Sequence, residues 1–110
     1  MSKYGNKRAV ASDGKVFSSK RECKRYEELL LLRKMRKITD LETQVKYQLL
    51  PAQKINGFTE RAVTYTADFR YYDRNALRWV VEDAKGAKTQ QYILRRKMML
   101  YFHDIKIEEI

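Results

Sequence analysis

Two consecutive segments between Val63 and Lys85 constrain this chain more than any other part of it. In residues 63–72, apolar side chains alternate with polar ones, which is the period of a half-buried strand and places Asp68 on the polar face. Residues 77–86 are rich in β-branched and aromatic residues up to a charged end, which predicts a partner strand. Together the two segments predict a β-hairpin.

The loop of this hairpin decides which side chains face each other. If Asn75 and Ala76 form a two-residue loop, with Asn75 accepting the positive φ of such turns, then Asp68 faces Asp83. The same register pairs Arg74 with Leu77, Tyr72 with Trp79, and Arg70 with Val81. A different loop length would break this facing.

Two facing carboxylates repel each other and destabilise a sheet by up to about 1 kcal/mol unless something neutralises them. A divalent cation would do so, and Mg²⁺ accepts one or two carboxylates while leaving positions for water and phosphate. Lys85 lies two residues after Asp83 and points the same way. The alternative is an exposed hairpin end in which Asp83 pairs with Lys85 or Arg70.

Asp68, Asp83 and Lys85 match the signature of the PD-(D/E)XK nuclease superfamily, which the chain resembles in its order of elements as well. More narrowly, it is similar to a family of small phage proteins labelled as a domain of unknown function and grouped with Holliday-junction-resolvase-like nucleases. That similarity is carried by Lys3-Tyr4-Gly5-Asn6-Lys7, Ser19-Lys20-Arg21-Glu22, Ala67-Asp68-Phe69 and Val81-Glu82-Asp83-Ala84-Lys85-Gly86.

The resemblance implies an α/β (α+β) fold with a restriction-endonuclease-like αβββαβ core, in which helices flank a mixed central sheet. It implies a metal-dependent DNA endonuclease, selective for branched or otherwise structured DNA in phage recombination or replication. Asp68 and Asp83 would hold Mg²⁺ or Mn²⁺, Lys85 would act on the water or the phosphate, and an acid in the first helix, Glu22, would reach the metal. Glu82 points to the opposite face, against Phe69, and is expected to have no metal role.

Charge points to a polyanionic partner. The chain has 24 Lys and Arg against 14 Asp and Glu, a net charge of +10. Its 110 residues predict one domain. DNA fits this charge better than a membrane, because no apolar run approaches the roughly 20 residues that span a bilayer. Charge alone also fits a basic amphipathic helix at a membrane surface.

The N-terminal residues lack an apolar signal core, so we expect a cytoplasmic protein, in the host cell if the chain is phage-encoded. The single cysteine, Cys23, offers no intramolecular disulfide and is expected to be a small buried residue. Symmetric cutting of a four-way junction needs two copies, so a homodimer follows from the proposed substrate.

The first third of the chain predicts an arm, a turn and a helix. Residues 1–11 predict a basic N-terminal arm, and Asp13-Gly14 predicts a small hairpin after it. Ser19 and Glu22 form a capping box for a helix that should end near Lys37. Glu22 has two interpretations of equal weight, a cap that bonds back to the Ser19 backbone and a metal ligand.

Residues 40–50 alternate and predict a strand that ends at Pro51, with Gln44 and Lys46 on its polar side, either bordering the site or on an exposed face. Residues 51–60, which contain Asn56-Gly57, predict a turning connection.

Thr89 predicts the N-cap of a helix to about Leu100, with Leu100 in the core, followed by a strand within 104–110. A strand, a helix and a strand predict a parallel pair. The candidates for phosphate contact are Lys88, Arg95, Arg96 and Lys97. His103 stands alone and is expected to be structural or solvated.

Two other functions compete with the nuclease. A non-catalytic nucleic-acid-binding phage regulator on the same fold would bind DNA without needing Asp83 or Lys85. A small basic protein that regulates a host protein would show no affinity for DNA at low salt.

Overall fold

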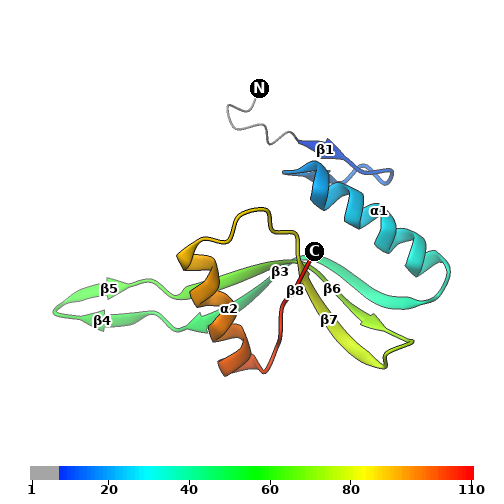
Figure 1. Cartoon of the computed structure of the whole chain (residues 1–110). Coiled ribbons are helices and arrows are strands. Elements are labelled where there is room, and N and C mark those ends of the chain that lie inside the picture. Colours follow the sequence, from blue (N-terminus) through cyan, green and yellow to red (C-terminus); the bar gives the residue numbers. More distant parts are fainter. Residues whose placement is uncertain (1–7) are drawn as a thin grey trace. The chain divides into compact units, whose positions relative to one another are not determined.

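The computed structural model describes residues 8–110, and these form a mixed α+β structure with two α-helices (Figure 1). The elements in chain order are β1 (Ala9–Val10), β2 (Val16–Phe17), α1 (Lys20–Lys34), β3 (Ile38–Leu50), β4 (Gln53–Ile55), β5 (Phe58–Glu60), β6 (Val63–Asp73), β7 (Arg78–Asp83), α2 (Gln90–His103) and β8 (Glu108–Glu109). The order of the longer elements is the predicted one. Within the described residues, neither helix is long and apolar enough to cross a membrane.

The chain divides into two compact units, and each is described by itself. Unit 1 contains the residues up to Leu41 together with Tyr71–Trp79, and unit 2 contains Glu42–Arg70 and Val80–Ile110. The single nuclease-like domain expected from the sequence stays a prediction. Of the predicted basic arm, residues 1–7 lie outside the described part, while Ala9–Val10 form β1.

In unit 1, a small hairpin is tied to α1. β1 and β2 pair antiparallel, and Gly14 in the predicted turn has φ +90°, a value that favours glycine. The Tyr26 hydroxyl of α1 donates to Asp13 at 2.5 Å, and the Phe17 and Tyr26 rings lie 4.9 Å apart. These contacts fix the turn against the middle of the helix.

Helix α1 begins at the predicted cap and ends earlier than predicted. The Ser19 side chain accepts the backbone N–H of Glu22, so the N-cap prediction is confirmed. The helix ends at Lys34 rather than near Lys37, and Met35, expected on the apolar face, is 53% exposed. The helix stops there because Arg36 adopts a left-handed conformation with φ 60°.

The largest sheet has the strand order β3-β6-β7-β8. β6 and β7 are joined by a short loop, whereas β7 and β8 pair in parallel, with Glu82 opposite Glu108 and Asp83 opposite Glu109. The sheet is therefore mixed, and the predicted parallel pair across α2 is confirmed. β8 is shorter than predicted, because Asp104 caps α2 in a left-handed conformation and strand pairing begins only at Glu108.

The loop between β6 and β7 differs from the prediction. Four residues, 74–77, separate the strands instead of two, and Leu77 rather than Asn75 has the positive φ. The Asp73 carboxylate accepts the backbone N–H groups of Asn75 and Ala76, a local side-chain bond that the two-residue assignment overlooked. The longer loop adds one residue on each side of Asn75-Ala76, which leaves the facing of the two strands unchanged. The Tyr72 and Trp79 rings lie 5.4 Å apart, as that facing requires.

Unit 2 has its own apolar core between α2 and the sheet. Tyr92 and Met99 of α2 belong to one buried cluster, whose other members are Leu49, Tyr65, Ala67, Val81 and Ile107. Fully burying one such side chain contributes about 1.5–3 kcal/mol. Leu100, predicted to face this core, is 52% exposed, because Met99 fills the inward position of that helical turn.

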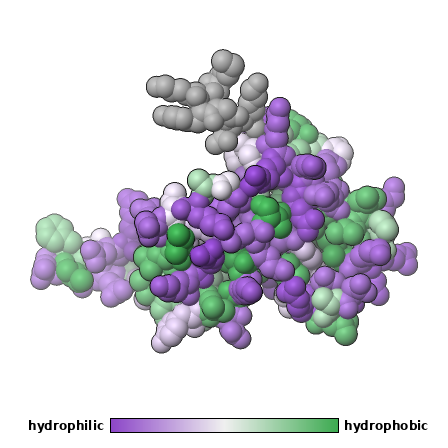
Figure 2. All heavy atoms as spheres, in the orientation of Figure 1, coloured by the Kyte–Doolittle hydropathy of each residue, from purple (hydrophilic) through white to green (hydrophobic). Residues whose placement is uncertain are grey.

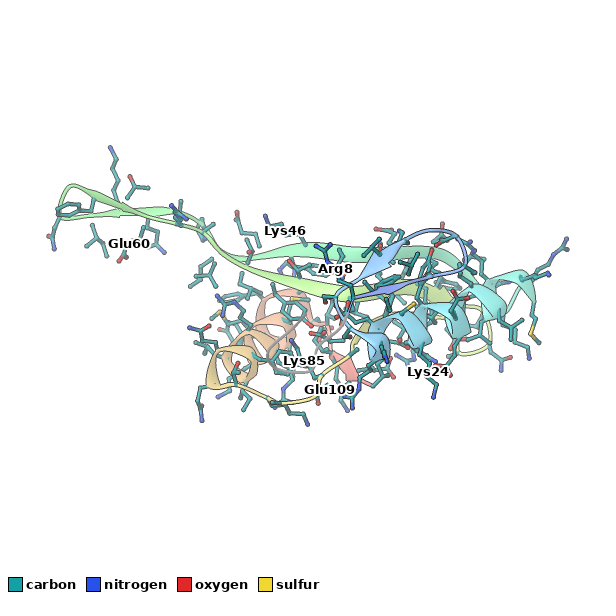
Figure 3. All side chains as sticks on the ribbon, turned by 90° about the horizontal axis from the view of Figure 1, so that it is seen from above. Arg8, Lys24, Lys46, Glu60, Lys85 and Glu109 are labelled. Carbon is teal, nitrogen blue, oxygen red and sulfur yellow. The ribbon has the colours of Figure 1, made fainter. Side chains whose placement is uncertain are left out.

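Residues 51–60 form more than the predicted connection. β4 and β5 pair as a second hairpin, which Figures 1 and 3 show reaching away from α2, with Glu60 labelled on it. Asn56 (φ 50°) and Gly57 (φ 79°) have the two positive φ values of a type I′ turn. Ile55 and Phe58 are exposed, and Figure 2 shows hydrophobic atoms at this tip.

Candidate functional site: a carboxyl pair beside a lysine

Asp68 and Asp83 come together in unit 2. Asp68 lies in β6, and Asp83 is the last residue of β7 and only 2% exposed. Asp68 is half-buried, and the neighbouring Asp83 is one of the causes that raise its pKa. Two carboxyl groups side by side favour a state in which one of them holds a proton.

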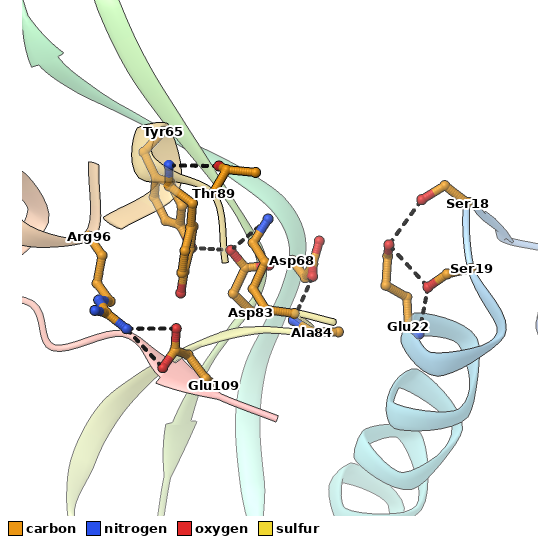
Figure 4. Close-up of polar contacts among 12 residues, drawn as sticks. Ser18, Ser19, Glu22, Tyr65, Asp68, Asp83, Ala84, Thr89, Arg96 and Glu109 are labelled. Atoms are coloured by element: carbon orange, nitrogen blue, oxygen red, sulfur yellow. Dashed lines mark hydrogen bonds and ion pairs between the residues drawn. The ribbon is translucent and has the colours of Figure 1, made fainter. Parts of the chain in front are cut away.

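Asp68 holds that proton over an unusually wide pH range. Burial, followed by the neighbouring Asp83 carboxyl, raises its pKa from the ordinary value of 3.8 to about 7. Two donors oppose the shift: the Ala84 N–H, 2.8 Å from Oδ2 (Figure 4), and the Gln44 side-chain amide, 3.4 Å from Oδ1. The carboxyl is therefore oriented by the backbone just beyond β7 and by a side chain of β3.

Asp83 is held by a tyrosine that crosses from β6. The Tyr65 hydroxyl donates to Oδ2 of Asp83, and both residues are buried (Figure 4). Burial and this hydrogen bond raise the pKa of Tyr65 well above its ordinary value. Tyr65 is thus a neutral donor at any physiological pH.

Lys85 places a positive charge next to the pair. Its Nζ lies 3.8 Å from Oδ2 of Asp83 and 4.7 Å from the centroid of the Tyr92 ring. In Figure 3, Lys85 is labelled beside α2. Asp83 therefore makes the ion pair with Lys85 that the alternative interpretation expects. Arg70, the other expected partner of Asp83, pairs with Glu42 at 3.0 Å.

The donor set fits a magnesium-type cation. Mg²⁺ is commonly bound by one or two carboxylates and completes its shell with water and phosphate oxygens. Asp68 and Asp83 supply two neighbouring carboxyl groups, and burial together with Asp83 raises the pKa of Asp68. Within residues 8–110, no group of three or more His, Cys, Asp or Glu side chains is arranged around a common point. The pair itself is therefore the candidate ligand set.

Glu22 acts as a cap in unit 1. Its Oε1 accepts from the Ser18 hydroxyl at 2.9 Å and from the Ser19 hydroxyl at 3.3 Å (Figure 4). The carboxylate therefore bonds to two serine side chains at the start of α1, and its predicted bond to the Ser19 backbone stays a prediction. Its role as a metal ligand stays a prediction.

The four predicted phosphate contacts have different environments in unit 2. The Nη1 of Arg96 donates to both carboxylate oxygens of Glu109, at 2.9 and 3.1 Å, and Lys88 lies 3.4 Å from the same carboxylate. Arg95 donates to the Thr64 carbonyl at 3.0 Å, whereas Lys97 is exposed. Arg95 is half-buried, because its guanidinium reaches back to β6.

Sequence reasoning missed Tyr65, Tyr92 and Glu109 as parts of this region. Tyr65 lies at an apolar position of β6, so the sequence pattern assigns it to the core. It does belong to the buried cluster of unit 2. Glu109 lies opposite Asp83 in the parallel register, a position that the final strand alone did not reveal. Gln44, for which the sequence allows either a place at the site or an exposed face, is exposed and donates to Asp68.

The contacts described for His103 and Cys23 do not involve Asp68 or Asp83. The His103 ring nitrogen is 2.8 Å from the Gln48 carbonyl and its ring packs edge-on against Tyr47, which agrees with the expected structural role. Cys23 is buried, as expected.

Comparison with known proteins gives one match. Residues 1–110 match the model of a family described as "Protein of unknown function (DUF1064)". No curated protein and no solved structure matches the chain.

Proposed function

This chain belongs to the DUF1064 family, and we propose that it is a metal-dependent DNA endonuclease that hydrolyses phosphodiester bonds. The observation that carries the proposal is the neighbouring carboxyl groups of Asp68 and Asp83, with the Lys85 Nζ 3.8 Å from Oδ2 of Asp83. Two carboxylates and a lysine at one point are the parts that Mg²⁺-assisted or Mn²⁺-assisted hydrolysis of a phosphodiester requires.

Each residue has a separate task in this proposal. Asp68 and Asp83 would hold the cation once Asp68 has lost its proton, and a bound cation would supply Lewis-acid chemistry toward the phosphate and an attacking water. Lys85 stabilises negative charge that grows on the phosphate, or orients the water. Tyr65 and the Ala84 N–H are positioning groups, because each fixes one carboxyl oxygen.

DNA is the proposed substrate because of the net charge of +10. A chain of 110 residues has little surface for reading bases, which favours recognition of DNA shape, such as branches or junctions. Symmetric cleavage of a four-way junction needs two active sites, so the proposal includes a homodimer.

The test is cleavage of a labelled four-way junction, a flap, a linear duplex and single-stranded DNA with Mg²⁺ or Mn²⁺. Asp83→Asn and Lys85→Ala should abolish cutting. Lys54→Ala, which removes an exposed lysine from the β4–β5 hairpin, is the matched control and should cut like the wild type. Cutting that survives both substitutions at the site would contradict the proposal.

The same assay distinguishes the nuclease from the alternative function, a non-catalytic nucleic-acid-binding regulator. Binding to DNA without cutting, unchanged by Asp83→Asn and Lys85→Ala, would favour a non-catalytic nucleic-acid-binding protein, for which the basic composition alone is sufficient. Absence of binding at low salt would favour a protein partner instead.

A further inference from the structure

Two loops of unit 1 form a pocket of about 270 Å³ that is lined by three basic residues. Its lining consists of Arg36 and Lys37, which follow α1, and Arg74 and Asn75, which follow β6. No acidic residue lines it, and within residues 8–110 no carboxylate pairs with these three cations. The carboxyl pair of unit 2 contributes nothing to it.

The two loops are bonded together at this point. The Arg74 N–H donates to the Lys37 carbonyl at 3.0 Å, and its guanidinium Nη1 donates to the Arg36 carbonyl at 3.1 Å. One edge of the Arg74 guanidinium is thus used to hold the loop, and its remaining donors are available. The pocket is therefore built by specific bonds and does not depend on chance positions of flexible side chains.

Asp73 precedes Arg74 in the sequence but serves the loop. Its Oδ1 accepts the backbone N–H groups of Asn75 and Ala76 at 2.9 and 3.0 Å. Asp73 therefore stabilises the loop, and it is not among the residues that line the pocket.

The dipole of α1 explains only part of this charge. Basic residues in the last helical turn offset the partial negative charge of a helix C-terminus, and Arg33 and Lys34 occupy that turn. Arg36 and Lys37 come after the helix has ended, and Arg74 comes from a different loop. Three cations that converge from two segments repel each other unless an anion joins them.

We propose that this pocket binds a phosphate group. Arginine and lysine are the side chains that bind phosphate oxygens, arginine through its planar fork and lysine as a point charge. The Asn75 side-chain amide adds a neutral donor. The phosphate can be free or part of a nucleic-acid backbone, since both present the same oxygens.

The proposal is independent of catalysis by Asp68 and Asp83. A nuclease-dead Asp83→Asn protein should bind phosphate at this pocket as the wild type does. Failure of the pocket and failure of the proposed activity are therefore separate results.

The first experiment follows the backbone amide signals of Lys37 and Asn75 by NMR while inorganic phosphate, or a short DNA duplex, is added at constant ionic strength, with chloride as the reference. Saturable shifts with phosphate alone identify a free-phosphate pocket. Saturable shifts only with the duplex identify a backbone-phosphate pocket. Shifts with neither ligand, or equal shifts with chloride, overturn the proposal.

The second experiment compares two double variants that remove the same charge. Arg36→Gln/Lys37→Gln changes the pocket, whereas Arg33→Gln/Lys34→Gln changes the last turn of α1 beside it. The pocket variant should weaken binding of the ligand identified by NMR by about tenfold or more. With the duplex it should also lower the log–log salt slope by about 0.9. Equal weakening in both variants would mean that only the total charge matters, and would overturn the proposal.

Discussion

The Tyr65 hydroxyl donates a hydrogen bond to Oδ2 of Asp83, and both residues are almost completely buried. Tyr65 comes from β6 and Asp83 from the end of β7, so the bond links the apolar core of unit 2 to its carboxyl pair. A buried carboxyl that loses its donor pays the full cost of desolvation. The position of Asp83 therefore depends on a residue that sequence patterns assign to the core.

Tyr65→Phe keeps the ring and removes this donor. We expect the free energy of unfolding to fall by about 1–3 kcal/mol, because Asp83 stays buried with one partner fewer. Metal affinity should fall about 10–100-fold, as is usual when a group that orients a ligand is removed. Chemical denaturation and calorimetric titration measure the two effects. A variant as stable as the wild type would show that the bond contributes nothing.

Tyr47→Phe is the matched control and makes a prediction of its own. The Tyr47 hydroxyl is buried and has no hydrogen-bond partner within the described residues, although its ring packs against the same core cluster. Removing an unsatisfied buried hydroxyl should raise the free energy of unfolding by up to about 1 kcal/mol. A loss of stability in the same denaturation experiment would contradict this.

Much of the fold could be predicted from the sequence. The alternation in β3 and β6, the Ser19 and Thr89 caps and the Asp-Gly turn are local signals, and the structure contains all of them. Asp68 and Asp83 could be placed together because the side-chain period of two and a hairpin connection restrict the register.

The rest depends on contacts that local patterns do not contain. The four-residue loop after β6 is set by the Asp73 carboxylate, and the contact of Glu109 with Arg96 is set by the parallel pairing of β8. The phosphate pocket combines residues from two loops that are far apart in the sequence. Such pairs become visible only when the chain is folded.

Stability should depend on pH through Asp68. Its pKa is about 7 in the folded chain and near 3.8 in an ordinary environment, so the folded state binds a proton that the unfolded state releases. The contribution of this group is complete below about pH 4 and is lost as the pH rises to about 7.

Asp68→Asn removes this titration. The stability of the variant relative to the wild type should therefore increase from about pH 4 to about pH 7 and then level off. Thermal unfolding without divalent metal, across this range, measures the difference. Groups whose pKa is lowered, such as Glu109, affect both proteins and cancel. A difference that does not change with pH would contradict the shift.

Gly57→Ala should loosen the β4–β5 hairpin alone. Gly57 has φ +79°, a conformation that costs a residue with a side chain about 1 kcal/mol. Because all residues of β4 and β5 are exposed, the loss should be local. Hydrogen exchange of the hairpin amides should become about fivefold faster, while the amides of α2 keep their protection. Asn56→Gly is the control and should cause no comparable strain.

The central claim is that Asp68 gives up its proton and, together with Asp83, binds a divalent cation. The most direct measurement is Mn²⁺ binding, followed by electron paramagnetic resonance above and well below pH 7, for the wild type, Asp68→Asn and Asp83→Asn. We predict binding by the wild type that strengthens as the pH rises through about 7, and loss of that binding in both variants. Binding that is equal in all three proteins, or that does not change with pH, would contradict the claim.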